Sequence, residues 1–187
     1  VKLKLSEIEP NKNQPRKNFD EEALAELSHS IELHGVLQPL VVRPMPDGSY
    51  QLVAGERRWR ASRMAGLTEV PVVIKELTDA QVAEIALVEN LQREDLDPIE
   101  EALGYKELAE KFDYTQEEIS NLVGASRPAI ANALRLLSLP EEIIKMVSIR
   151  ELSAGHARAL LTLEDDKAKI ELAKLVIKED ISVRETE

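Results

Sequence analysis

The sequence contains no cysteine among its 187 residues. It can therefore form neither a disulfide framework nor a thiolate zinc site. It also lacks any long apolar run, which excludes a membrane-spanning helix or a secretory signal. These absences predict a cytosolic protein. With 43% apolar residues, the chain can bury one core of moderate size or two small ones, and we expect two.

Basic residues are in short supply. The chain has 24 Lys and Arg against 35 Asp and Glu, so its formal net charge is −11. A nucleic-acid-binding protein normally needs a basic surface to neutralise phosphates. The charges are unevenly spread, however: residues 76–101 hold nine acids against one arginine, whereas residues 127–158 hold five basic residues against three acids. The basic surface is therefore local, which predicts modest and strongly salt-dependent binding to DNA.

The first half of the chain has the pattern of a small α/β unit. Residues 46–48, Pro-Asp-Gly, have turn chemistry and predict a hairpin between the runs on either side. Apolar residues at helical spacing predict a helix over 21–34 that stops at Gly35, and a second helix begins at Gly55. Short β-type runs occupy residues 1–8, 40–43, 50–53 and 70–74.

From Thr78 onward the sequence predicts mostly helix. Asp97 and Pro98 have the chemistry of an N-cap and a first helical residue. Residues 115–118, Thr-Gln-Glu-Glu, form a capping box for another helix. Residues 164–187 have the pattern of one charged amphipathic helix that ends without a stop signal.

Together these patterns predict the fold class α+β, mostly helical. We expect an α/β domain at residues 1–96 and an all-helical domain at residues 97–187. A natural chain usually begins with Met, whereas this one begins at Val1 and its last predicted helix has no stop. We therefore expect a piece of a longer protein, cut at both ends.

The most informative segment is residues 55–61, Gly-Glu-Arg-Arg-Trp-Arg-Ala, in which a β-type run passes through a glycine directly into a helix. At such a junction the first helical N–H groups have no intrahelical partner, and they bind anions together with guanidinium groups. The alternative is a solvated basic helix face with Trp59 packed beneath it. The segment predicts a polyphosphate site, and we expect Trp59 in the core rather than stacked on a base.

Glu89 and Asn90 lie near the end of a predicted helix over residues 78–93. Neighbouring residues do not share a helix face. Both side chains could nevertheless reach one metal ion at a frayed helix end, where their hard oxygen atoms suit Mg²⁺. Alone the pair would be ordinary surface. The arginine segment gives it weight, because Mg²⁺ accompanies polyphosphates.

Residues 115–137 have the pattern of a helix-turn-helix motif. Gly124 makes the turn, and Ser126 opens the second helix. Arg127, at the start of this recognition helix, is expected to contact a guanine base. A purely structural helical hairpin would have the same apolar seam, which consists of Ile119, Leu122, Ile130, Leu134 and Leu137.

Residues 153–158, Ser-Ala-Gly-His-Ala-Arg, begin another helix. A serine N-cap with Arg158 one turn further on could grip a DNA phosphate. A lone histidine such as His156 is more typical of a surface or packing position. The residues predicted to contact DNA are Thr115, Gln116, Ser126, Arg127, Pro128, Asn132, Arg135, Ser153, Gly155, His156 and Arg158.

On these motifs the chain resembles the ParB family of bacterial chromosome and plasmid partition proteins. The resemblance covers essentially the whole chain. It implies a sulfiredoxin-like nucleotide-binding domain followed by a DNA-binding domain. It further implies a clamp that binds CTP with Mg²⁺, closes after contact with its parS centromere site, slides along DNA and slowly hydrolyses CTP. The matching segments are residues 14–16, 34–43, 55–61, 89–94 and 126–128.

The resemblance also implies roles for single residues. Glu89 and Asn90 would coordinate the metal ion, and Gln14, Arg16 and Glu56 would act in hydrolysis by orienting water or offsetting charge. The preference for cytosine rests on the resemblance alone. The residues implied to contact the nucleotide are Gly35, Leu37, Gln38, Pro39, Gly55, Glu56, Arg57, Arg58, Arg60, Ala61, Asn90 and Arg93.

Partners and location are implied in the same way. They are parS DNA, a second copy of the protein when nucleotide is bound, and a ParA-type ATPase and SMC condensin that the full-length protein would contact. The implied location is the cytoplasm, on the nucleoid, with no membrane partner.

Three alternatives stay open at this point. A nucleoid occlusion factor of the same family would carry a Gln and extra Lys or Arg where this chain has Arg127, Ala133 and Gly155, so the chain resembles the parS-binding branch. A plain helix-turn-helix transcription repressor would use the arginine segment only as a structural anion site. A metabolic enzyme of the sulfiredoxin-like fold would have no use for the helix-turn-helix motif, and the absent cysteine excludes sulfiredoxin chemistry.

Overall fold

The computed structural model describes residues 1–12 and 19–187, which divide into two compact units, Val1–Asn90 and Leu91–Glu187. The first unit combines a sheet with helices, and the second is all-helical. The predicted fold class, α+β and mostly helical, is therefore confirmed. Among the described residues, no helix is both long and apolar enough to cross a membrane.

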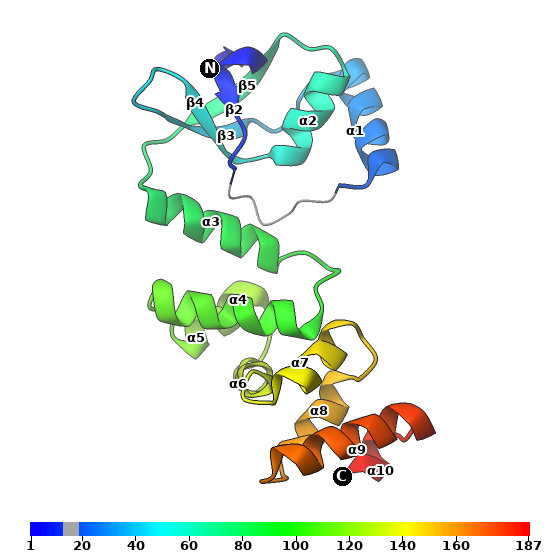
Figure 1. Ribbon diagram of the computed structural model, residues 1–187. Helices are drawn as coiled ribbons and strands as arrows, with labels where there is room; N and C mark the ends of the chain where they lie inside the picture. The colour runs from blue at the N-terminus through cyan, green and yellow to red at the C-terminus, as the bar shows by residue number, and fades with distance from the viewer. Residues whose placement is uncertain (13–18) are drawn as a thin grey trace. The chain divides into compact units, whose positions relative to one another are not determined.

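Strand β3 (Leu40–Pro44) lies at the centre of the sheet in the first unit (Figure 1). The strand order in the described residues is β1-β5-β3-β4-β2. β3 runs antiparallel to β4 (Tyr50–Ala54) and parallel to β5 (Glu69–Ile74). The β3–β4 pair is the predicted hairpin, and its turn is closed by a hydrogen bond from the Met45 N–H to the Ser49 carbonyl.

The prediction of one β-type run over residues 1–8 is wrong. The chain instead forms β1 (Lys2–Lys4), a 3-10 turn η1 (Leu5–Glu7) and β2 (Ile8–Glu9). β1 pairs with β5 and β2 pairs with β4, so the two short strands lie at opposite edges of the sheet. The physical reason lies in Leu5 and Ile8, which are both buried although three residues apart. A straight strand would direct them to opposite faces, and the turn directs both inward.

Helices α1 (Glu21–His34) and α2 (Glu56–Met64) pack against each other beside the sheet (Figure 1). Asp20 caps α1 by accepting hydrogen bonds from the N–H groups of its first turn, as its residue type favours. Trp59 of α2 is buried in the sheet's core, so its expected core position is confirmed. The last helix of this unit is α3 (Asp79–Leu91).

The helices of the second unit enclose a core of their own. α6, α7, α8 and α9 contribute most of it, including fully buried Ile143, Val147 and Leu160. The predicted caps Asp97, Thr115, Ser126 and Ser153 all begin helices. The helices are α4 (Pro98–Lys111), α5 (Gln116–Val123), α6 (Arg127–Leu136), α7 (Glu141–Ser148), α8 (Ala154–Leu160), α9 (Asp166–Glu179) and α10 (Val183–Thr186).

The prediction of a single helix over residues 164–187 is also wrong. α9 ends at Glu179, the next residue Asp180 has a left-handed backbone with φ of 50°, and α10 follows as a separate short helix. The break has a local cause. Ser182 and Glu185 form a capping box, in which the serine hydroxyl accepts from the Glu185 N–H and the glutamate accepts from the Ser182 N–H.

Candidate functional sites

The arginine motif lies where β4 passes into α2. Gly55 makes this junction in a left-handed conformation with φ of 103°, and it has no side chain to cap the first turn of the helix. The N–H groups of that turn are therefore available to an anion. A side chain at this position would fit badly, because a Cβ atom on Gly55 would come within 2.7 Å of the Leu40 Cδ2. The N–H groups at the start of α2 fit a phosphate, and the packing of Leu40 against Gly55 requires a glycine at the junction.

Arg58 joins the motif to the turn that precedes β3. Its Nη1 donates to the carbonyl oxygens of both Gln38 and Pro39, each at 2.8 Å. The structure thus brings together two segments that the sequence assigned separately to the nucleotide site. Leu37 in this turn has 83% of its surface exposed, which is unusual for a leucine and leaves an apolar surface beside the motif.

Glu56 and Arg60 form an ion pair on one face of α2. The Glu56 carboxyl group is buried, and its Oε1 accepts from the Arg60 Nε at 3.0 Å. Its Oε2 is also buried and has no hydrogen-bond partner among the described residues. A buried carboxylate oxygen without a partner is costly, and a water molecule or a cation would satisfy it.

Arg60 has a second contact. Its guanidinium group lies 4.1 Å from the centroid of the Phe19 ring, a cation–π arrangement. Both Arg60 and Arg57 are exposed on this helix, and Arg60 is additionally held by its contacts to Glu56 and Phe19. The two remaining predicted hydrolysis residues, Gln14 and Arg16, lie outside the described residues.

Glu89 and Asn90 occupy the last turn of α3, which ends at Leu91 rather than at the predicted Arg93. Both residues therefore lie at the end of the helix, one turn or less from its terminus, as the prediction of a metal site at a helix end requires. Within the described residues, no group of three or more His, Cys, Asp or Glu side chains could hold a metal ion. A cation at Glu89 and Asn90 would need further ligands from phosphate oxygens and water, and this fits Mg²⁺.

Arg93 lies just beyond α3 and pairs with Asp95. Its Nε and Nη2 donate to the two carboxylate oxygens at 3.0 and 3.2 Å. This hydrogen-bonded pair raises the pKa of Arg93. The two bonds to Asp95 use two of the five guanidinium N–H donors of Arg93.

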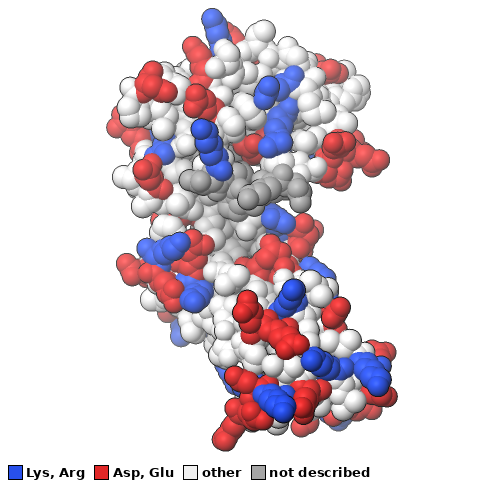
Figure 2. Space-filling model, viewed as in Figure 1, with Lys and Arg blue, Asp and Glu red and all other residues white. Residues whose placement is uncertain are grey.

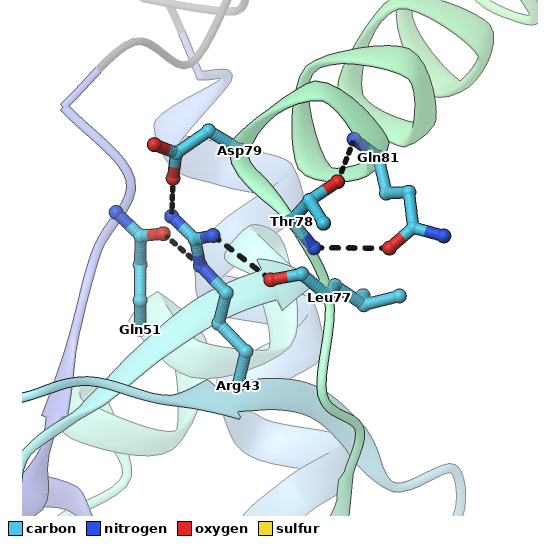
Figure 3. A network of polar contacts seen from close by, with 6 residues as sticks. All are labelled: Arg43, Gln51, Leu77, Thr78, Asp79 and Gln81. Atoms are coloured by element: carbon cyan, nitrogen blue, oxygen red, sulfur yellow. Dashed lines mark hydrogen bonds and ion pairs between the residues drawn. The ribbon is translucent and has the colours of Figure 1, made fainter.

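Sequence reasoning missed one buried cluster, centred on Arg43 of β3 (Figure 3). The Arg43 guanidinium donates to the Gln51 side chain, to the Leu77 carbonyl and to the Asp79 carboxylate. These partners lie on β4 and at the beginning of α3. A signal was present in the sequence, because a charged residue inside an apolar strand usually has a buried partner.

The helix-turn-helix motif consists of α5 and α6. Ile119 and Ile130 are fully buried at the seam, and Gly124 makes the turn in a left-handed conformation. Arg127 is exposed at the start of α6, as the prediction requires, but its Nη2 lies 3.1 Å from the Glu117 Oε2. Glu117 was missed by sequence reasoning. Since both side chains are more than 60% exposed, the ion pair is weak and can open.

Four of the other predicted DNA-contacting residues line a hollow of about 400 Å³ in the second unit: Asn132, Arg135, Gly155 and Arg158. Ser153 caps α8, as predicted. His156 is held within the protein: its Nδ1 lies 2.6 Å from the Ser153 Oγ, and its Nε2 lies 2.7 Å from the Ile181 carbonyl. His156 thus links α8 to the segment before α10. Residues lining the hollow include Asn132, Arg135, Gly155, Arg158, Thr162 and Val183.

The surface charge agrees with the acidic composition. On the face drawn in Figure 2, acidic and basic side chains are interspersed rather than gathered into one basic area. Two of the basic residues, Arg135 and Arg158, line the same hollow in the second unit.

An α/β unit with a strand-glycine-helix motif, followed by an all-helical unit with a helix-turn-helix motif, defines a class of two-domain proteins. The chain belongs to the ParB family. Residues 1–91 match the family model of the ParB N-terminal domain, and residues 94–187 match that of the ParB HTH domain.

Its relatives include chromosome-partitioning proteins. The chain is 56% identical over 187 residues to Spo0J of Thermus thermophilus, covering 100% of this chain and 68% of that protein. It is 54% identical over 187 residues to ParB of Myxococcus xanthus, covering 100% of this chain and 63% of that protein. A nucleoid occlusion protein of a Geobacillus species is 45% identical over 186 residues, covering 100% of this chain and 66% of the relative. The chain thus spans about two thirds of the length of these relatives.

Solved structures agree with this assignment. C-terminally truncated ParB of Caulobacter crescentus, complexed to the centromeric parS site, matches with a TM-score of 0.84 and 48% identity, covering 100% of this chain and 96% of that one. A Pnob8-like ParB-N domain matches with a TM-score of 0.64 at 13% identity, covering 93% of this chain and 83% of that one. At this identity the match supports the fold alone.

The tight junction at Gly55 predicts a specific loss of stability. Gly55→Ala should destabilise the first unit by about 1–3 kcal/mol through its left-handed backbone and by about 1–3 kcal/mol more through the clash with Leu40. Gly48→Ala is the matched control, because Gly48 also has a positive φ but has open space around it. Trp59 is the single tryptophan and lies in this unit, so urea unfolding followed by its fluorescence measures both losses. Equal losses in the two variants would contradict the clash.

Proposed function

We propose that this chain is the nucleotide- and DNA-binding part of a bacterial chromosome-partitioning protein. The second unit binds a parS centromere site, and the first unit binds CTP with Mg²⁺. Nucleotide binding then closes the protein as a clamp that slides along DNA, and slow CTP hydrolysis releases it. The observation that carries the nucleotide part is the pair of hydrogen bonds from Arg58 to Gln38 and Pro39.

These hydrogen bonds support one composite nucleotide site. The free N–H groups after Gly55 and the exposed Arg57 suit the triphosphate, because both present donors to anionic oxygens. The turn from Gly35 to Pro39 lies beside them through Arg58 and offers backbone groups and the exposed Leu37 to the base. The choice of cytosine rests on the family resemblance.

The metal ion and the hydrolysis residues are part of the same proposal. Glu89 and Asn90 would hold Mg²⁺, which when bound would neutralise charge on the phosphate oxygens. Glu56 offers the free Oε2 atom as an acceptor for an attacking water molecule. Gln14 and Arg16 stay in the proposal on the resemblance alone.

Binding of parS is assigned to α6 and α8. Arg127 would exchange its exposed ion pair with Glu117 for a guanine base, and this exchange costs little because water already screens the pair. Asn132, Arg135 and Arg158 line one hollow, where they could grip base edges or phosphates. The Caulobacter crescentus relative that was solved with parS supports this assignment.

The proposed partners extend beyond this chain. They are a second copy in the nucleotide-bound state, a ParA-type ATPase and SMC condensin, all acting on the cytoplasmic nucleoid. Gly155 favours the partition function over nucleoid occlusion. A Cβ atom there would lie 3.1 Å from the Val183 Cγ2, so the extra basic residue of nucleoid-occlusion proteins would require the Val183 side chain to shift by a few tenths of an ångström.

The nucleotide site predicts a difference between two arginines of one helix. Arg57→Ala should weaken CTP binding roughly tenfold to a hundredfold, the value of a lost charge-assisted hydrogen bond of about 1.5–3 kcal/mol. Arg58→Ala should weaken it further, because the variant also loses the contacts to Gln38 and Pro39. Arg63→Ala is the matched control, since Arg63 lies in the last turn of α2. Isothermal titration with CTP and Mg²⁺ measures all three.

Two results would remove the nucleotide proposal. One is CTP affinity in Arg57→Ala and Arg58→Ala equal to that of Arg63→Ala. The other is a CTP turnover that does not rise when parS DNA is added. Neither a plain repressor nor a metabolic enzyme predicts such coupling.

The DNA site predicts sequence-specific effects. Arg127→Ala should cost about 1–3 kcal/mol on parS DNA and much less on random DNA, because a bidentate guanine contact is lost. Glu117→Gln should leave parS binding unchanged or tighten it, since it releases Arg127 from its ion pair. Fluorescence anisotropy with both DNAs at one fixed salt concentration measures these effects. Equal weakening on both DNAs would show that Arg127 contacts only phosphate, and tighter binding to a nucleoid-occlusion operator would overturn the partition assignment.

A further inference from the structure

Arg43 is a buried arginine with all three kinds of guanidinium nitrogen in use. Its side chain, on the central strand β3, is only 11% exposed. Nε donates to the Gln51 Oε1 at 2.8 Å, Nη1 to the Leu77 carbonyl at 3.1 Å, and Nη2 to the Asp79 Oδ1 at 2.7 Å (Figure 3). A guanidinium group with donors on three sides cannot rotate without losing one of them. Its position is therefore fixed.

Two of these partners belong to the beginning of α3. Leu77 precedes the helix, and Asp79 is its first residue. In the same segment, Thr78 and Gln81 form a capping box, in which each residue's side chain accepts from the other's N–H (Figure 3). One residue group thus starts the helix and attaches it to the sheet. The chain before it is held as well, because the Lys75 N–H donates to the Val42 carbonyl.

The far end of α3 carries Glu89 and Asn90. Glu89 lies ten residues after Asp79, which places it about 15 Å along the helix axis. A rotation of α3 by about 10° at its first turn would therefore displace Glu89 by about 3 Å. This exceeds the Mg²⁺–oxygen distance of about 2.1 Å, so such a rotation would break metal coordination.

We propose that Arg43 is a positioning residue for the metal pair: it fixes the first turn of α3 to the central strand and so sets where Glu89 and Asn90 lie relative to the arginine motif. This inference rests on the proposed nucleotide site. The directed hydrogen bonds of Arg43 hold α3 in place more than its charge does. The Asp79 carboxylate is 94% exposed, so its ion pair alone is worth little, whereas the bonds to Gln51 and Leu77 are partly buried. Lysine, with one compact ammonium group, could not hold all three partners.

The test separates metal-dependent from metal-independent CTP binding. In Arg43→Lys, CTP binding without Mg²⁺ should stay within about twofold of the unchanged chain, because the arginine motif remains. The gain in affinity on adding Mg²⁺ should fall by about tenfold or more, as in the loss of residues that orient metal ligands. In Asp79→Ala, the gain in CTP affinity on adding Mg²⁺ should be about threefold smaller than in the unchanged chain. This variant should still fold, because the Asp79 side chain is exposed. Lys75→Met is the control for charge in the same segment, and it should keep the full gain. Isothermal titration with CTP, with Mg²⁺ or with EDTA, measures each value.

A second measurement needs no nucleotide. Because the chain has no cysteine, spin labels can be attached at Ser30→Cys on α1 and Ala83→Cys on α3, both exposed positions. The distance distribution between the labels should be narrow in the parent chain and broader in Arg43→Lys. An unchanged distribution, or an intact Mg²⁺-dependent gain in both Arg43→Lys and Asp79→Ala, would overturn the role of Arg43. If instead the parent chain binds no CTP, the proposed function fails, and the label distances still decide whether Arg43 fixes α3.

Discussion

Arginine guanidinium groups hold both ends of strand β3 through hydrogen bonds to backbone carbonyl groups. At its start, Arg58 binds the carbonyls of Gln38 and Pro39, and near its end Arg43 binds the carbonyl of Leu77. A guanidinium group can do this because its donors diverge in one rigid plane. Helix α2 therefore fixes the turn before the central strand through Arg58, the strand fixes α3 through Arg43, and the proposed nucleotide site depends on both.

Local chemistry explains most of what could be predicted. Asp97, Thr115 and Ser126 begin helices as their side chains favour, since an N-cap is decided by its nearest neighbours. The strand-glycine-helix junction at Gly55 is equally local. The motifs that carry the nucleotide and DNA proposals were therefore identified from the sequence, although their contacts to nucleotide, metal ion and DNA stay predictions.

Most of the wrong or missed predictions concern features that depend on contacts between segments far apart in the sequence. The spacing of Leu5 and Ile8 hints locally at a turn, but the two strands with which the divided segment pairs lie far along the chain. Arg43 was missed for the same reason, since its partners lie up to 36 residues away in sequence. Ion pairs such as that of Arg127 with Glu117 likewise depend on how two helices meet. The break at Asp180 is different, because the capping box of Ser182 and Glu185 was visible in the sequence.

The divided first strand has a consequence for the order of folding. The β3–β4 hairpin closes a short loop and can form early, whereas Lys2 pairs with Pro71 and Ile8 pairs with Tyr50 across much longer stretches of chain. Loop-closure entropy delays such distant pairings. Each edge strand also needs its neighbour to be in place first. The N-terminal residues 2–9 are therefore expected to be among the last to reach their folded positions. Until they do, β4 and β5 lack their edge neighbours.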